Sequence, residues 1–274
     1  MSIAVGEDAE TAIAIAAFER APVSEGAGSA AQRFVRRDGG GVPAHTGPGI
    51  LRIRFRFPMD GRVTPDAARI LNRAVRPLLH ALRGLTPLSH YFGRDTVSVK
   101  MGGTRHDVAA LGFAHDGEAD QGIFEAFLGV RRDARRDLVC LRDLLGEDRL
   151  DSVAGRIVAA FEREGAVRTP LVPLPVAPPE PPWDAVTETP FARVGAARFP
   201  LAVGGDFFAS SDWMRHLTSS LADLPLSPTD DQVRALFGDV PPPGRVLLGV
   251  ETPIVLATTV LRALRGEPRA HGGT

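Results

Sequence analysis

Strict alternation of apolar and arginine side chains marks the clearest strand in this chain. The seven residues from Leu51 to Phe57 place an apolar side chain at every odd position and Arg52, Arg54 and Arg56 between them. Because successive side chains of a strand point to opposite faces, the pattern predicts a half-buried strand with its apolar side on the core. The arginine side is interpreted as a solvated or ion-paired sheet surface.

Apolar residues at helical spacing predict two long helices. Thr64-Pro65-Asp66 combines a capping residue, a first-turn proline and an acidic residue, the usual start of a helix. The apolar spacing then continues to Gly84, with a kink expected at Pro77. A second amphipathic helix is predicted from Asp151 to Arg163. Its inward side chains are Val153, Ile157, Val158 and Phe161.

Three further apolar segments predict strands. Residues 96–99 and 108–113 flank a Gly102-Gly103 turn and are typical of a hairpin, and residues 123–130 form another apolar run. Strands and helices mixed in this order favour a mixed or antiparallel sheet with flanking helices. The first domain is therefore predicted to be α+β.

A proline-dense stretch divides the chain. Residues 169–190 contain eight prolines and are predicted to form an extended, semi-rigid linker. It separates a first domain, residues 1–168, from a smaller C-terminal α/β domain, residues 191–268, and residues 269–274 are expected to be a disordered tail. In the second domain we expect a strand at 246–250 and helices near 212–223, 228–237 and 253–265.

Composition narrows the class of protein. The 274-residue chain carries a net charge of −1, and Lys100 is the one lysine among 32 basic residues. The balanced charge and the scarcity of tyrosine and tryptophan argue against a nucleic-acid-binding surface. No apolar run reaches the length of a membrane span, and the single cysteine, Cys140, indicates a reducing compartment, so we expect a cytoplasmic protein. The seven histidines show no metal-ligand spacing, and no metal is expected.

The most informative motif is a glycine-rich segment between residues 36 and 49. Two arginines precede three consecutive glycines, and His45 follows four residues after the last of them. Glycine lets the backbone bend around a bound group and aim N–H donors at it, while arginines recognise phosphate or carboxylate. The alternative interpretation is an ordinary surface turn.

With these elements in place, the region from about Phe34 to Phe161 resembles the biotin/lipoate protein ligase and octanoyltransferase superfamily. Arg36-Arg37-x-Gly39-Gly40-Gly41-x-x-x-His45 is similar to the acyl-adenylate loop of the lipoate ligases, and Gly47-Pro48-Gly49 to the octanoyltransferase version. Gly93-Arg94-Asp95 is similar to the ligases' Gly-Arg-Asn-Asp segment. Asp137-Leu138-Val139-Cys140 resembles the segment that carries the octanoyltransferases' cysteine nucleophile.

The resemblance implies an active site assembled from these segments. The implied substrate-binding residues are Arg36, Arg37, Gly39, Gly40, Gly41, Gly47, Gly49, Arg94 and Asp95. The implied catalytic residues are Cys140 as nucleophile and His45 as an orienting or proton-transferring group, with Asp107 and Lys100 as candidates at or near the family's essential lysine. From the residues alone, Cys140 is equally a small core residue, and Lys100 and Asp107 are equally surface residues of a hairpin. The catalytic interpretation requires Cys140 and the three glycines to face one cleft.

Two departures from the family pattern stand out. Asp107 occupies the position of the lysine that holds the reacting carboxyl or adenylate oxygen, and a carboxylate there would repel that group. Only 33 residues precede Phe34, so the family's N-terminal helix and first strands are expected to be largely missing.

Two functions follow. The first is an enzyme that transfers a lipoyl- or octanoyl-type acyl group to a carrier protein or amine acceptor, using ATP with magnesium, a pre-formed acyl-adenylate or an acyl thioester. The second is a catalytically degenerate member that binds a ligand or acts as a scaffolding subunit, with a second chain supplying the missing N-terminal elements. We favour the enzyme, because the loop and the cysteine are both retained.

Overall fold

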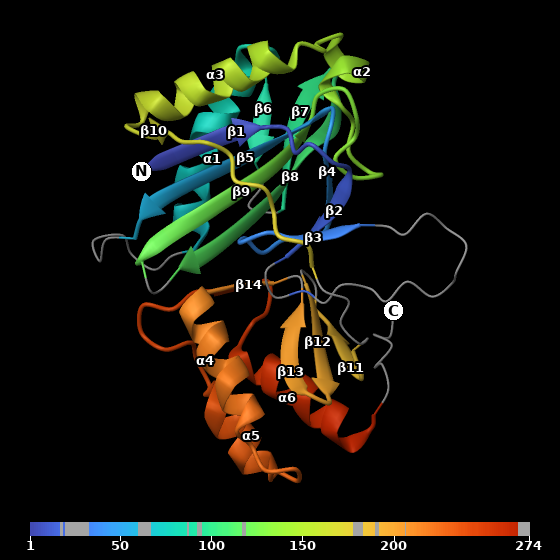
Figure 1. Ribbon diagram of the computed structural model, residues 1–274, viewed down its shortest axis with the longest axis vertical. Helices are drawn as coiled ribbons and strands as arrows, with labels where there is room; N and C mark the ends of the chain where they lie inside the picture. Colours follow the sequence, from blue (N-terminus) through green and yellow to red (C-terminus); the bar gives the residue numbers. More distant parts are fainter. Residues whose placement is uncertain are drawn as a thin grey trace.

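The computed structural model describes residues 1–16, 19, 33–59, 67–86, 88–91, 95–116, 119–177, 183–189, 192–205 and 207–267 (Figure 1). Two units lie one above the other along the long axis of the molecule. The upper unit is built on a wide sheet, and the lower one holds the C-terminal helices. Arg94 and the predicted tail 269–274 lie outside the described residues.

A seven-stranded sheet forms the upper unit. Its neighbours are antiparallel except for the first pair, so the sheet is mixed, as expected. The predicted arginine-rich strand and the predicted hairpin are both confirmed and lie in its middle. In spatial order the strands are β10 (Val167–Arg168), β1 (Ser2–Gly6), β5 (Ile50–Pro58), β9 (Gln121–Gly129), β8 (Thr104–Asp116), β7 (Thr96–Met101) and β6 (Ser89–Tyr91).

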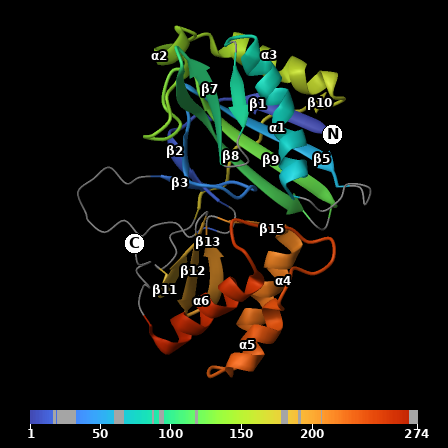
Figure 2. The same cartoon turned by 180° about the vertical axis from the view of Figure 1, so that it is seen from behind.

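Both predicted helices pack on one side of this sheet, called the helix face below. Figure 2 shows α1 (Ala67–Arg83) lying across it, and α3 (Leu150–Arg163) runs beside α1 at the upper edge. Pro77 lies inside α1, where the kink is expected. The inward side chains of α3 are all buried, and together with the odd-numbered residues of β5 they form the main core. Burying each such apolar side chain contributes about 1.5–3 kcal/mol.

A second layer covers the opposite side of the sheet. This layer is a small sheet in the order β3-β2-β4, comprising β3 (Phe34–Arg36), β2 (Ala12–Ile15) and β4 (Ala44–Thr46). Arg52 therefore has 0% of its side chain exposed, so a solvated arginine face is the wrong interpretation at this position. The ion-paired interpretation is right: Arg52 contacts Asp8 at 3.0 Å, and Arg54 and Arg56 both pair with Asp38.

The N-terminal strands that the sequence analysis expected to be missing are present. β1 pairs with β5 along its whole length and with β10, and β2 is the middle strand of the small sheet. Short apolar runs of four and five residues are enough to form them, because each has a neighbouring strand on both sides. The reason given for a second chain that supplies these strands therefore does not hold.

The lower unit has its own core. All three predicted helices are confirmed, while the predicted strand at 246–250 is reduced to two residues. The sheet β11-β12-β13 is antiparallel and was not predicted, and its first strand begins inside the stretch predicted as linker. The elements are β11 (Ala185–Glu188), β12 (Arg193–Arg198), β13 (Leu201–Gly205), β14 (Phe208–Ala209), α4 (Ser211–Ala222), α5 (Asp230–Phe237), β15 (Leu247–Leu248) and α6 (Pro253–Arg265).

A buried polar contact joins the two units. His115 on β8 forms a β-bridge with Ser210, and its Nδ1 lies 3.3 Å from the Ser210 Oγ. The other ring nitrogen lies 3.2 Å from Asp120 Oδ1, and the serine Oγ accepts a hydrogen bond from the Val246 N–H at 2.7 Å. This Ser-His-Asp group is an interdomain connection rather than a catalytic set, because the serine is fully buried. It fixes the start of α4 against β8.

The described helices include no segment with the length and hydrophobicity of a membrane-spanning helix.

Candidate functional site

The side of the main sheet opposite α1 and α3, called the site face below, gathers most of the residues implied by the resemblance. Val97 and Val99 pack into the helix-face core, so Ser98 and Lys100 belong to the site face. Register then places Asp107, the partner of Ser98, on the same face. Lys100 and Asp107 thus share one surface of the hairpin.

The glycine-rich loop lies directly on β8. A Cβ on Gly112 would stand 2.2 Å from the Gly40 carbonyl oxygen, and one on Gly41, whose φ is +91°, would stand 2.2 Å from the Leu111 oxygen. Only glycine allows this approach at both places. The Gly39 N–H donates to Glu125 Oε2 at 2.8 Å. The Gly40 N–H donates to the Phe113 oxygen, so both of these amides are used within the fold, and a ligand-binding role for the loop remains a prediction.

Arg37 is the cation held by this loop. Its side chain is buried, with the guanidinium carbon 5.4 Å from the centre of the Phe127 ring and Nη2 donating to the Val42 oxygen at 2.8 Å. Burial lowers the pKa of Arg37 to about 10, partly offset by the nearby Glu125, so it remains protonated at neutral pH. Its Nε and Nη1 are buried without a hydrogen-bond partner in the described part of the chain. Arg37 is thus a fixed charge with two unused donors.

A cavity of about 580 Å³ opens beside Arg37, between the site face and α4. Residues one turn apart on α4 form its lower wall, and the sheet and the loop form the upper one. Its chemistry is mixed, with three arginines, two aspartates, three hydroxyl side chains and two apolar ones. The lining residues are Arg37, Asp38, Arg56, Asp116, Ile123, Ser211, Met214, Arg215, Thr218 and Ser219. An anionic group attached to a short apolar segment matches this composition.

A second charged cluster lies where β7 begins. Arg135 bonds Asp137 at 2.5 Å and lies 3.9 Å from Asp95, whose backbone oxygen accepts from Leu111 N–H. The Arg135 hydrogen bond lowers the pKa of Asp137. Asp95 therefore lies beside β8 and Arg135, and its substrate-binding role remains a prediction.

The Asp107 carboxylate forms an ion pair with Arg105, a residue of the same strand. Ser98 Oγ donates to its carboxylate at 2.5 Å, and Arg105 Nη2 lies 3.0 Å away. Lys100 is exposed, pairs with Arg105 in the register and makes no ion pair within the described residues. Catalytic roles for Asp107 and Lys100 remain predictions.

Cys140 does not have the environment predicted for a nucleophile. The thiol is buried, and its backbone N–H donates to Asp133 Oδ1 at 2.8 Å. Burial raises the pKa of Cys140, with the Asp143 and Asp133 carboxylates adding to the shift. Arg142, two residues further along the chain, pairs with Asp143 at 3.1 Å. The cavity beside Arg37 is not lined by Cys140, and a nucleophilic role for Cys140 remains a prediction.

The other implied residues of the loop have local structural partners. His45 is half-buried on β4, and burial together with Arg132 and Arg136 lowers its pKa, so it is neutral at pH 7. A Cβ on Gly47 would lie 2.8 Å from the Glu10 oxygen. Gly49, with a φ of +90°, packs on the Arg131 and Arg132 side chains, and Arg36 Nη1 donates to the Glu19 oxygen at 2.7 Å. A ligand-binding role for these residues remains a prediction.

Two groupings were missed from the sequence. Glu125 is fully buried beneath the loop, 3.9 Å from Arg52, and a lone acidic residue inside the apolar run 123–130 was the available signal. Asp133, Cys140 and Asp143 bring their ligand atoms within 4.8 Å of one another. Clusters that include exposed acidic side chains are common in proteins without a metal, so we assign no metal to this one.

Comparison with known proteins identifies the fold. No family model and no curated protein sequence matches the chain. Among solved structures, P. falciparum LipL1 in complex with lipoate aligns over 96% of this chain and 86% of its own, with a TM-score of 0.56 at 9% identity. The bipartite lipoate protein ligase of Thermoplasma acidophilum aligns over 62% of this chain and 74% of its own, with a TM-score of 0.47 at 13% identity. The chain therefore has a lipoate-ligase-like α+β fold, and the likeness to LipL1 covers both units.

Proposed function

We propose that this protein is a ligase-type acyltransferase that binds an acyl-adenylate and passes a lipoyl- or octanoyl-type acyl group to an amine of a carrier protein. The observation that carries the proposal is Arg37, a buried cation with two unused donors that lines a cavity on the site face. A buried, unpaired guanidinium is costly unless an anion completes it. The fold shared with LipL1, which was crystallised with lipoate, supports an acyl substrate of this type.

Each part of the ligand has a matching part of the cavity. Arg37 and Arg56 carry the charge suited to the phosphate, and Ile123 and Met214 supply apolar contacts for the acyl chain. If ATP is the donor of the adenylyl group, it would bring that phosphate to the same arginines.

The transfer needs no enzyme thiol. The lone pair of the acceptor amine forms a C–N bond with the acyl carbonyl carbon, the C–O bond to the phosphate breaks, and AMP leaves with that oxygen. One amine proton passes to water. The raised pKa of the Cys140 thiol disfavours the thioester route, which requires a thiolate.

The test is acylation of a lipoyl domain followed by intact mass. We expect wild type to add one lipoyl mass from lipoyl-adenylate, with or without activity from lipoate and magnesium ATP. Arg37→Lys should lower the rate, while Arg163→Lys, at the exposed end of α3, should not. No added mass from either donor with any lipoyl-type acceptor contradicts the enzyme proposal.

The degenerate alternative has one observation in its favour, the carboxylate of Asp107 at the position of the family's lysine. A binding subunit would hold the adenylate and not discharge it. Tight binding of lipoyl-adenylate without any transfer, and copurification of a stoichiometric second chain from the native host, would favour that function.

A further inference from the structure

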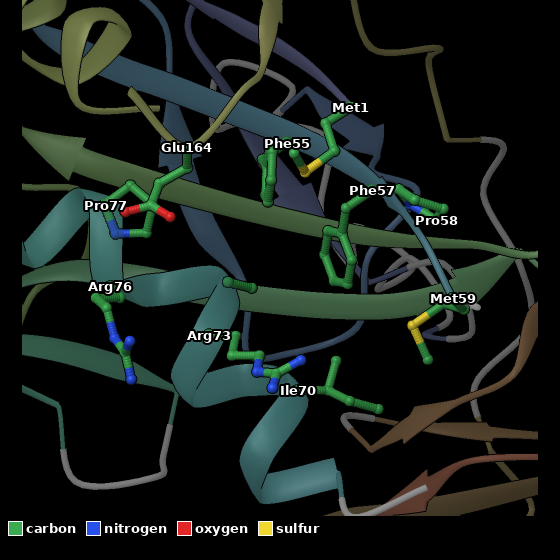
Figure 3. A pocket seen from close by; sticks show the side chains of 11 residues that line it. Met1, Phe55, Phe57, Pro58, Met59, Ile70, Arg73, Arg76, Pro77 and Glu164 are labelled. Carbon is green, nitrogen blue, oxygen red and sulfur yellow. The ribbon is translucent and has the colours of Figure 1, made fainter. Parts of the chain in front are cut away.

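A second cavity lies on the other side of the sheet. It has a volume of about 380 Å³ and is enclosed by β5, α1 and the end of α3 (Figure 3). β5 separates the two cavities, because Arg56 lines the first and its neighbours Phe55 and Phe57 line the second. The second cavity is therefore distinct from the proposed acyl-adenylate site.

Two aromatic and two sulfur-containing side chains form the part of its wall that lies along and beside β5. Figure 3 shows the Phe55 and Phe57 rings pointing from β5 toward α1, with Met1 next to Phe55 and Met59 beyond Phe57. The two rings stack at 5.1 Å between centroids, and Phe55 also packs on Phe161 at 4.8 Å. Two tight ring contacts fix this wall in place, so the apolar surface is pre-formed.

The remaining lining residues give the cavity a positive edge. Arg73 and Arg76 lie one turn apart on α1, and Figure 3 shows Arg73 extending beside Ile70, next to the apolar wall. Neither arginine makes an ion pair within the described residues. Among the lining residues that the structure describes, Glu164 is the one carboxylate and stands against two arginines.

We propose that this cavity binds an aliphatic monocarboxylate, with its chain against Phe55, Phe57 and Ile70 and its carboxylate at Arg73. The size fits a small ligand, since cavities that hold such molecules begin at about 300 Å³. An apolar wall with a cationic edge selects a fatty acid over a neutral alcohol of equal length. The proposal does not depend on the proposed enzymatic function, because the two cavities share no residue.

Calorimetry with hexanoate, octanoate, decanoate and octanol tests the site on the full chain. We expect affinity to rise about fourfold for each added methylene until the cavity is full, the ratio for about 0.8 kcal/mol per buried CH₂. Octanol should bind more weakly than octanoate. Arg73→Gln should weaken octanoate about threefold to fivefold, as for an exposed ion pair, and Arg83→Gln on the same helix should not.

A variant that fills the cavity tests whether the aliphatic chain of octanoate binds there. Ala74 lines the cavity from α1, so Ala74→Leu should abolish octanoate binding while thermal unfolding stays cooperative. The proposal is overturned if no carboxylate binds, or if Ala74→Leu folds and still binds octanoate as wild type does. Should Ala74→Leu fail to fold, equal octanoate affinities for Arg73→Gln and Arg83→Gln would overturn it.

Discussion

Gly39 and Glu125 are joined by a fully buried hydrogen bond of 2.8 Å between residues 86 positions apart. It attaches the glycine-rich loop to the centre of the main sheet. Glu125 also lies 3.9 Å from Arg52, which in turn pairs with Asp8 at 3.0 Å. The loop is thus held by a chain of buried charges that begins in the N-terminal segment.

Removing the Glu125 carboxylate from this series of buried charges should lower the free energy of unfolding. We expect Glu125→Ala to destabilise the fold by about 3–5 kcal/mol, because it leaves the Arg52 guanidinium buried with one fewer negative partner. Glu125→Gln should cost less, since an amide oxygen still accepts from Gly39. Urea unfolding of both variants checks this, with the exposed Glu162→Ala on α3 as control. Equal stability of Glu125→Ala and Glu162→Ala would contradict the role assigned to the charge chain.

The close approach of the loop to β8 gives a second prediction. Gly41→Ala should destabilise the protein by about 3 kcal/mol or more, because the added Cβ meets the Leu111 oxygen at 2.2 Å in addition to the positive φ. Gly103→Ala is the matched control, with a φ of +85° and nothing within 4 Å of its Cβ. It should cost about 1–2 kcal/mol, the backbone strain alone. Similar thermal shifts for the two variants would show that the loop does not lie against the strand.

Cys140 should be dispensable for acyl transfer. We expect Cys140→Ala to keep the transfer rate within about twofold of wild type, because the raised pKa of the thiol disfavours the thiolate. Iodoacetamide should modify the folded protein slowly at pH 7.5 and rapidly in urea. An acyl-enzyme mass that disappears in Cys140→Ala would restore the thioester route.

The lowered pKa of His45 has a consequence for stability. The unfolded state binds a proton at higher pH than the folded state, so the unfolding free energy falls as pH drops through and below about 6.5. His45→Gln should remove this contribution and lose less stability than wild type between pH 8 and pH 5. Thermal midpoints across this range provide the measurement, and His80→Gln on the outer side of α1 serves as the control. Parallel curves for wild type and His45→Gln would contradict the assignment.

The sequence predicted most helices and strands because the spacing of their apolar residues is strongly periodic. The alternation in 51–57 and the helical spacing in 151–163 each specify one buried face, and both faces are where they were expected. The strands β12 and β13 of the lower unit were not predicted, because they are short and rich in alanine and glycine, which have weak strand propensity.

Closeness in the sequence was a poor predictor of which residues contact one another in the site. Arg142 lies two residues from Cys140 in the sequence but pairs with Asp143, while the charged partners of Arg37 and Arg52 come from positions far away in the chain. The burial of Arg52 depends on a second layer formed by β2, β3 and β4, whose runs of three or four residues carry little periodic signal. Both the ion-pair partners of these arginines and the burial of Arg52 depend on tertiary packing, which the local sequence pattern does not encode.

The most direct test of the acyl-adenylate site is calorimetric titration of a non-hydrolysable lipoyl-adenylate analogue into wild type, Arg37→Lys and Arg163→Lys. The proposal predicts that Arg37→Lys loses about 1.5–3 kcal/mol of binding free energy while the control binds like wild type. Unchanged affinity in Arg37→Lys would contradict it.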